Sequence, residues 1–167
     1  EKSSDSFVWT ADKQIFKVYY ALDENGDNVP DYQEKNSIDR FEKSLVTGTA
    51  PAGITIPEGI TVKYPSAGET IIVPVNSSVT LMYQFTVEGK AGTQFTISDD
   101  GATAVGGNYT SATTGNITGT IPDGGTATIY AIKTFQPEDI DEAKSVLTNN
   151  ATITVASGTI ADGENSD

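Results

Sequence analysis

The alternation of apolar and polar residues predicts a chain built mainly of β-strands. In residues 79–89, the apolar residues Leu81, Tyr83, Phe85 and Val87 alternate with residues of mixed polarity, so one face of the strand is strongly apolar. The same alternation recurs in QFTIS, ATIYAIKTF and NATITVA, and clusters of Gly, Asn, Asp and Pro separate these short segments. Short alternating segments divided by turn signals are typical of a sandwich of two antiparallel sheets. We therefore expect an all-β fold.

Three further patterns predict local elements. The tetrapeptide Pro122–Gly125 (PDGG) contains residues suited to a chain reversal, and we expect a hairpin there. A short helix is expected near residues 137–144 (PEDIDEAK), because this segment begins with Pro and acids and ends with Lys. Ile38, Phe41 and Leu45 have the spacing of one helical face.

The composition changes along the chain in a way that predicts two parts. Residues 16–22 alternate like a strand and lead into an acidic loop, whereas beyond residue 57 Thr, Val, Ile and Tyr dominate. The segment TGTAPAGITIP (residues 47–57) combines Gly, Ala and Pro like a connector. We expect an N-terminal strand and loop segment in residues 1–50, followed by the β-sandwich in residues 51–167.

Charge and composition exclude several classes of function. The 167 residues have a net charge of −13 and include no His and no Cys. An acidic chain lacks the basic face that binds nucleic acid or anionic membranes. Without His and Cys, the chain cannot form a Ser-His triad, a Cys nucleophile, the usual zinc sites or a disulfide. We therefore expect a protein that is not an enzyme, binds no nucleic acid and, having no long apolar run, does not insert into a membrane.

An acidic loop in the N-terminal part predicts a calcium site. Oxygen-bearing side chains occur at relative positions 1, 3, 5, 9 and 12 of a twelve-residue run, as in EF-hand-type loops, with a main-chain carbonyl at position 7. The predicted Ca²⁺ ligands are Asp23, Asn25, Asp27, Val29 (carbonyl), Asp31 and Glu34. Asn28 occupies position 6, where Gly is usual, and Asn tolerates left-handed backbone. The alternative is a solvated acidic turn.

This loop resembles known calcium motifs. The run DENGDNVPDYQE resembles the D-x-N-x-D-G-x-P-D-x-x-E loops of thrombospondin type 3 and dockerin-like repeats. The longer segment VYYALDENGDNVPDYQEK is similar to inter-domain segments of large surface proteins of gut Firmicutes. The resemblance implies that bound calcium has a structural role and stiffens a joint between modules.

The second part of the chain resembles a different family. From about residue 60 to 155, the segments TVKYPSAGE, VTLMYQFTVEG, FTISDDGA, GTIPDGGTATIYAIKTF and LTNNATITV resemble DUF11-like, Ig-like β-sandwich domains of bacterial surface proteins. The resemblance implies an extracellular structural role. Such domains and related collagen-adhesin-type modules sometimes contain a spontaneous isopeptide bond between Lys and Asn, promoted by a buried acid. The candidates for this bond are Lys63, Asp99 and Asn149.

The chemistry of such a bond requires all three side chains in the core. A neutral amine must attack the amide carbon, which burial of the lysine and polarisation of the amide by a protonated carboxyl would favour. Asp99 and Asn149 have the inward parity of the strands beside them, but Lys63 has outward parity relative to Val62. The alternative is an exposed Lys, a turn-capping Asp and an Asn that hydrogen-bonds to nearby backbone.

Taken together, these features favour a non-catalytic structural or adhesive module of a Gram-positive surface protein. Such a module would be extracellular and cell-wall associated. Its partners would be neighbouring modules of the same polypeptide and, for an adhesin, a host glycan or protein. Two alternatives remain. One is a carbohydrate- or mucin-binding module with Trp9 or Tyr109 in its contact surface, and the other is a subunit of an extracellular filament.

The calcium hypothesis predicts a selective gain in thermal stability. Calcium that binds only the folded loop raises the melting temperature by linkage, whereas magnesium and EDTA do not. The double change Asp23→Ala and Asp27→Ala should abolish the rise. Thermal unfolding of the 167-residue chain in EDTA, in magnesium and in titrated calcium measures this. An unchanged melting temperature in all three conditions would reduce the loop to a solvated turn.

Overall fold

The computed structural model describes residues 36–139, 148–155, 159–160 and 164–166. The chain divides into two compact units, Glu1–Glu34 and Lys35–Asp167. The first unit lies outside the described residues, as do the expected strand at residues 16–22 and the whole predicted calcium loop. The calcium site therefore stays a prediction, and the following description concerns the second unit.

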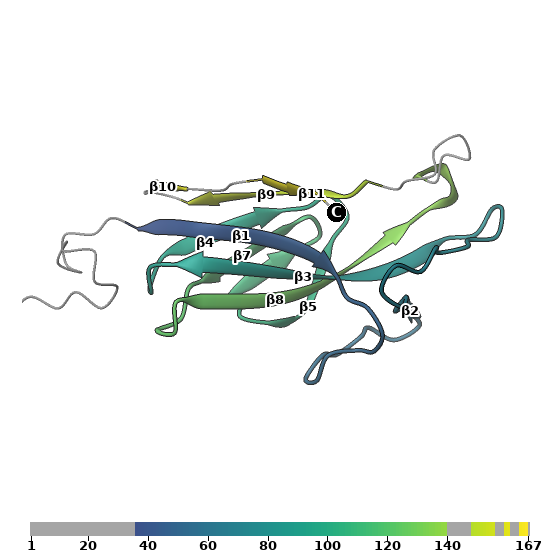
Figure 1. Ribbon diagram of the computed structural model, residues 1–167, viewed down its shortest axis with the longest axis horizontal. Coiled ribbons are helices and arrows are strands. Elements are labelled where there is room, and N and C mark those ends of the chain that lie inside the picture. Colours follow the sequence, from purple (N-terminus) through teal and green to yellow (C-terminus); the bar gives the residue numbers. More distant parts are fainter. Residues whose placement is uncertain (1–35, 140–147, 156–158, 161–163, 167) are drawn as a thin grey trace, which may run out of the picture. The chain divides into compact units, whose positions relative to one another are not determined.

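The second unit consists of two mainly antiparallel β-sheets that pack together (Figure 1), which confirms the predicted all-β sandwich. Sheet A has the strand order β10-β1-β3-β8-β5, and β2 pairs with β3. Only two described pairs in it are parallel, β10 with β1 and β2 with β3. The strands of sheet A are β1 (Ser37–Leu45), β2 (Val62–Lys63), β3 (Val79–Gly89), β5 (Thr103–Gly107), β8 (Thr126–Phe135) and β10 (Thr159–Ile160).

Sheet B has the order β11-β9-β4-β7-β6, and its described pairs are all antiparallel. In Figure 1, β4 and β7 lie behind β1, β3 and β8. The strands of sheet B are β4 (Gln94–Ser98), β6 (Ser111–Thr113), β7 (Asn116–Thr120), β9 (Asn150–Val155) and β11 (Glu164–Ser166).

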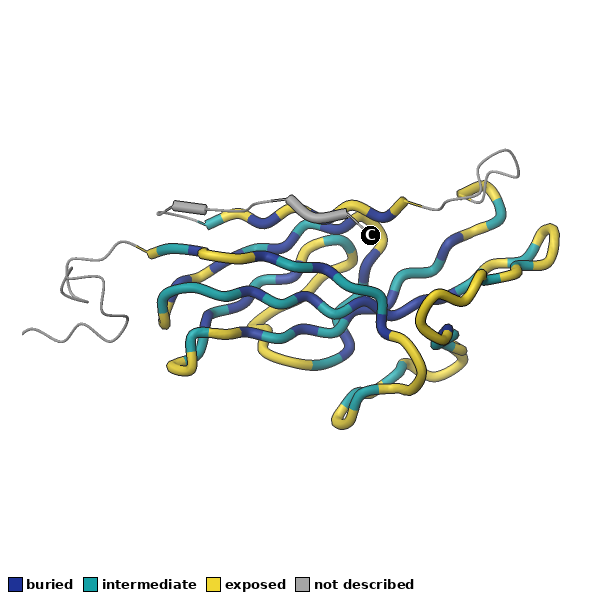
Figure 2. Tube along the Cα trace, in the orientation of Figure 1, coloured by how far each residue is buried: buried dark blue, intermediate teal, exposed yellow. Residues whose placement is uncertain are grey.

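The main core lies between the two sheets. Buried positions alternate with less buried ones along the strands (Figure 2), as expected when one face of each sheet is covered. Phe41 on β1 and Phe85 on β3 stack with their ring centroids 6.1 Å apart. Burying a side chain of this size stabilises the fold by about 1.5–3 kcal/mol. Sheet B contributes Phe95, Ile97, Ile117, Ala151 and Ile153 to this core.

A second, smaller apolar cluster covers the opposite face of sheet A. Met82 and Ile132 have the opposite parity to the core residues of β3 and β8, yet both are buried. They pack with Val46 and Val105 and with partly buried residues of the 46–64 segment, including Ile54 and Tyr64. The predicted connector at residues 47–57 has no strand of its own and helps to cover this face.

The predicted helical spacing of Ile38, Phe41 and Leu45 was wrong, because Ser37–Leu45 forms strand β1. Register with β3 shifts between Ile38 and Arg40, so that β1 contains one extra residue at this bulge. The bulge places Ile38 and Phe41 on the same face although they are three residues apart. Strand β1 belongs to the second compact unit, which begins at Lys35. The sequence analysis had placed residues 35–50 in the N-terminal part.

The turn at Pro122–Gly125 forms, but it does not close a hairpin. Gly125 N–H donates to the carbonyl of Pro122 over 2.9 Å, and Gly125 has φ of +73°. However, β7 pairs within sheet B and β8 within sheet A, so the turn carries the chain from one sheet to the other.

In the segment of the expected helix, residues 137–144, the structure has a 3-10 turn at Pro137–Asp139, and residues 140–147 lie outside the described part. No helix in the described residues has the length and apolar character to span a bilayer.

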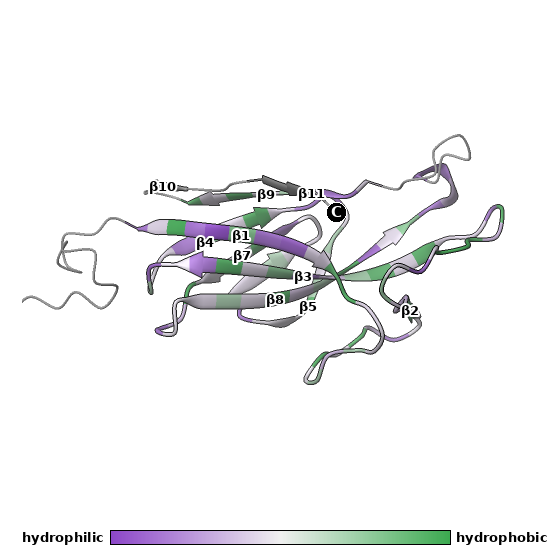
Figure 3. Ribbon diagram, viewed as in Figure 1, coloured by the Kyte–Doolittle hydropathy of each residue, from purple (hydrophilic) through white to green (hydrophobic). Residues whose placement is uncertain are grey.

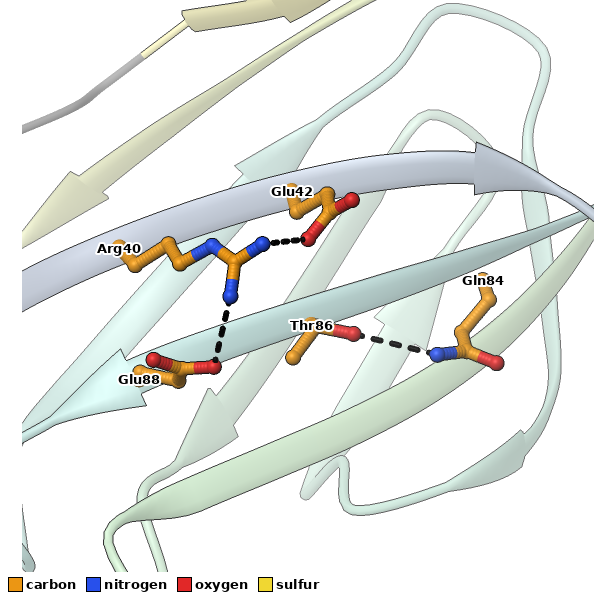
Figure 4. A network of polar contacts seen from close by, with 5 residues as sticks. All are labelled: Arg40, Glu42, Gln84, Thr86 and Glu88. Carbon is orange, nitrogen blue, oxygen red and sulfur yellow. Dashed lines mark hydrogen bonds and ion pairs between the residues drawn. The ribbon is translucent and has the colours of Figure 1, made fainter.

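The outward face of β1, and that of β3 from Gln84 to Glu88, is polar. Strand β1 is hydrophilic over much of its length (Figure 3). Arg40 pairs with Glu42 on its own strand and lies 3.4 Å from Glu88 on β3 (Figure 4). Gln84 donates to Thr86 over 3.2 Å on the same face. Exposed ion pairs of this kind contribute about 0–1 kcal/mol, so they keep the surface hydrated more than they stabilise the fold.

The backbone conformation of Gly107, at the end of β5, predicts that replacing this glycine by a larger residue destabilises the fold. Gly107 has φ of +97°, and a Cβ there would lie 2.1 Å from the carbonyl oxygen of Thr128. Gly107→Ala should therefore lower the free energy of unfolding by about 3 kcal/mol, the upper range for one strained backbone position. Gly124→Ala is the matched control, because that Cβ would meet nothing within 4 Å. Urea unfolding measures both, and equal effects would contradict the steric argument.

Candidate functional site: a buried lysine, aspartate and asparagine cluster

Two lysines of sheet A point toward sheet B. Lys43 on β1 has the inward parity of Phe41, and its side chain is fully buried. Lys133 on β8 has the inward parity of Ala131 and Phe135, and its side chain is 17% exposed. Strand β3 lies between these two strands. An inward-facing lysine in a sandwich core requires partners, because a charge removed from water is costly unless it is paired.

Sheet B supplies the partners. Asp99 directly follows β4 and is buried, held by a turn in which Ala102 N–H donates to the carbonyl of Asp99 over 3.0 Å. Asp99 N–H donates in turn to the carbonyl of Gly115 over 3.0 Å. Asn149 directly precedes β9 and is 1% exposed. The inward orientation that strand parity predicted for Asp99 and Asn149 agrees with their burial.

The four polar side chains meet across the sandwich. Lys43 Nζ lies 3.0 Å from Asp99 Oδ2 and donates to the main-chain oxygen of Asn149 over 2.8 Å. Lys133 Nζ donates to Asn149 Oδ1 over 2.9 Å and lies 3.7 Å from Asp99 Oδ1. Both lysines therefore contact the carboxylate of Asp99 and one oxygen of Asn149, the main-chain oxygen for Lys43 and the side-chain oxygen for Lys133.

The hydrogen bonding of this cluster is incomplete. Among the described residues, neither carboxylate oxygen of Asp99 accepts a hydrogen bond of good geometry, although Lys43 Nζ is within 3.0 Å of one of them. Asn149 Nδ2 is also buried without an acceptor in the described part. An unsatisfied buried polar group costs about 1–3 kcal/mol, so this arrangement is an expensive one for a purely structural cluster.

Aromatic rings form the walls around the two ammonium groups. Lys43 Nζ lies 4.4 Å from the ring centroid of Tyr83 and 5.8 Å from that of Phe85. Lys133 Nζ lies 5.3 Å from the ring centroid of Phe135. Ring faces attract cations without accepting their protons, so they hold each nitrogen in place while excluding water.

Lys63, the lysine that the sequence proposed for the crosslink, lies elsewhere. It is on β2 with its side chain 39% exposed, and its Nζ is 3.8 Å from Glu69. The pKa of Glu69 is lowered chiefly by the hydrogen bond from Ser66 N–H, with a smaller contribution from Lys63. Lys63 thus lies at the surface, as its outward parity indicated, and Lys43 takes the place beside Asp99.

The charges of the cluster favour a chemical change. Two ammonium groups and one carboxylate give an excess of one positive charge in a region nearly closed to water. Transfer of a proton from Lys43 to Asp99 would convert an ion pair into two neutral groups, which a low-dielectric surrounding favours. A neutral amine beside a buried amide is a nucleophile next to an electrophile. The cluster can therefore support amide exchange between Lys43 and Asn149.

Comparisons with known proteins add no family to this picture: no family model, no curated protein and no solved structure matches the chain significantly. The described residues also contain no group of three or more acidic side chains placed to hold a metal ion. The four-residue cluster is therefore the site on which a functional argument can be built.

The burial of Lys43 predicts a large effect on stability. Lys43→Met removes the donor to the main-chain oxygen of Asn149 and leaves the Asp99 carboxylate with only the longer contact to Lys133. It should lower the free energy of unfolding by about 1–3 kcal/mol, the cost of leaving a buried polar group without its partner. Lys63→Met is the control and should change it by less than about 0.5 kcal/mol. Both are compared by urea unfolding in an Asn149→Ala background, which has no side-chain amide to crosslink. Equal effects of the two changes would refute the assignment.

Proposed function

We propose that residues 35–167 form a structural module whose two sheets are joined by an isopeptide bond between Lys43 and Asn149, with Asp99 as the proton-transfer group. One observation supports this above all. A fully buried lysine, a buried aspartate and a buried asparagine contact one another across the sandwich, with polar atoms that a purely structural cluster would leave unsatisfied. Amide formation would remove one of those groups, the Asn149 Nδ2.

The reaction balances without any added reagent. Asp99 takes one proton from the Lys43 ammonium, and the neutral amine attacks Cγ of Asn149. The proton on Asp99 passes to Nδ2, the Cγ–Nδ2 bond breaks and ammonia leaves. The attacking nitrogen sheds its second proton to Asp99 and then to solvent. The products are one secondary amide, one ammonia and one proton, and no group is oxidised or reduced.

The bond would stabilise the fold in two ways. It would remove the excess positive charge, because Asp99 and Lys133 would remain as a balanced pair. It would also join positions separated by 106 residues. By the chain-entropy estimate used for disulfides, closing a loop of about 100 residues contributes about 4–5 kcal/mol. A chain without Cys has no disulfide to supply this constraint.

A covalently braced sandwich suits a module that spaces or presents an adhesive part of an extracellular, cell-wall-associated protein. Its partners in this proposal are the neighbouring modules of the same polypeptide, with calcium at Asp23–Glu34 stiffening the joint on the N-terminal side. The reaction at Lys43 occurs once per chain and consumes its own side chains, so the module does not turn over an external substrate. The absence of His and Cys from the sequence supports this non-enzymatic role.

The crosslink predicts a specific intact mass. The folded chain should be lighter than its sequence mass by one ammonia, and proteolysis should release a branched peptide that joins Lys43 to Asn149. Lys43→Met and Asn149→Ala should each show the full mass, Asp99→Ala should lose ammonia far more slowly, and Lys63→Met should behave like the unaltered chain.

Peptide mapping is essential to this test, because an asparagine that cyclises onto its own backbone also loses ammonia. The proposal fails if the folded chain has its full sequence mass, or if the lighter species contains only linear peptides.

A further inference from the structure

The second lysine of the cluster occupies a position that the crosslink alone does not require. Lys133 is on β8, opposite Leu81 of β3, and its Nζ donates to the side-chain oxygen of Asn149 over 2.9 Å. Lys43 makes a different contact, with the main-chain oxygen of the same residue. The two lysines therefore approach Asn149 at different atoms.

We propose that Lys133 is a further catalytic residue of the crosslinking reaction, whose ammonium stabilises the oxyanion that forms on Asn149 Oδ1 when Lys43 attacks. This inference rests on the proposed crosslink and assigns a role within it. Attack on an amide carbon moves negative charge onto its oxygen, and a donor already in place at that oxygen lowers the barrier.

The contact with Lys133 also orients the amide. A lysine ammonium has three donors and no acceptor, so the amide atom that it contacts must be the oxygen. Nδ2 is then directed away from Lys133, and it has no acceptor among the described residues. Nδ2, which must leave as ammonia, therefore has no hydrogen-bond partner among the described residues. Oδ1, which must become negatively charged, accepts a hydrogen bond from Lys133.

The surroundings of Lys133 keep its ammonium at this point. Its side chain passes the Asp99 turn, where a Cβ on Gly101 would lie 3.8 Å from Lys133 Cε. The ring of Phe135 lies 5.3 Å from its Nζ. A charged donor held in place in a mostly dry site is stronger than the same donor in water, and it needs no reorganisation during the reaction.

The geometry gives the two lysines different tasks. The side chain of Lys43 has no contact with solvent and lies 3.0 Å from Asp99 Oδ2, which can take its proton. Lys133 keeps some contact with solvent and is 3.7 Å from the other oxygen, Oδ1. Asp99 therefore transfers protons from the amine of Lys43 to the leaving nitrogen of Asn149. Lys133, rather than a protonated carboxyl, polarises the Asn149 amide.

The rate of crosslinking tests this assignment. The full chain is made by cell-free synthesis, quenched in acid at intervals, and the species lighter by one ammonia is measured by intact mass. Lys133→Met should slow its appearance by about 10²–10³-fold, the loss typical of removing one oxyanion donor. Lys133→Arg and Lys133→Gln, which keep a donor, should be slower than the unaltered chain but faster than Lys133→Met. Lys63→Met, a lysine outside the cluster, should leave the rate unchanged.

The outcomes separate this inference from the proposed crosslink. An unaltered chain that never loses ammonia refutes the crosslink itself. Circular dichroism checks that Lys133→Met is folded. If the folded variant crosslinks as fast as the unaltered chain, the crosslink itself stands and the role of Lys133 is refuted. A branched peptide at Lys133 instead of Lys43 would make Lys133 the nucleophile and overturn it as well. If Lys133→Met does not fold, Lys133→Gln takes its place in the comparison. Crosslinking of Lys133→Gln at the rate of the unaltered chain would contradict the need for a charged donor.

Discussion

The ion pair between Lys43 and Asp99 is the contact on which the proposed crosslink depends. It joins sheet A to sheet B through two side chains that are almost completely withdrawn from water. Such a pair is weak support for stability, because desolvation offsets much of the Coulomb attraction. Its significance lies in reactivity, since the same burial that makes the charges expensive also favours their neutralisation beside the amide of Asn149.

Strand parity alone was sufficient to predict half of this cluster. Asp99 and Asn149 continue regular alternations, and the sequence correctly indicated that both point inward. Lys133 follows the same rule on β8, where Ile129 and Ala131 are buried, so its inward direction was available from the pattern although its partners were not. Parity states which face a residue occupies, but it does not state which residues of the other sheet lie opposite.

Lys43 could not be found in this way, because a bulge hides the alternation of β1. The extra residue near Asp39 gives Ile38 and Phe41 a spacing of three, and the polar residues of the strand weaken its β signal. The turn at Pro122–Gly125 shows a related limit. Its residues specify a reversal, but long-range pairing decides whether the following strand joins the same sheet or the other one. Local patterns therefore predicted elements better than pairings.

The position of the proposed bond within the topology gives it a mechanical meaning. Lys43 is near the end of the first described strand, and Asn149 directly precedes β9, one of the last. A tensile force applied through the two ends of the module would pass from β1 through the amide into β9, and residues 44–148 would lie outside its path. Hydrogen bonds in β3, β4, β7 and β8 would then carry little load. A single covalent bond at this point would protect most of the sandwich, which is the property that the proposed spacer under tension requires.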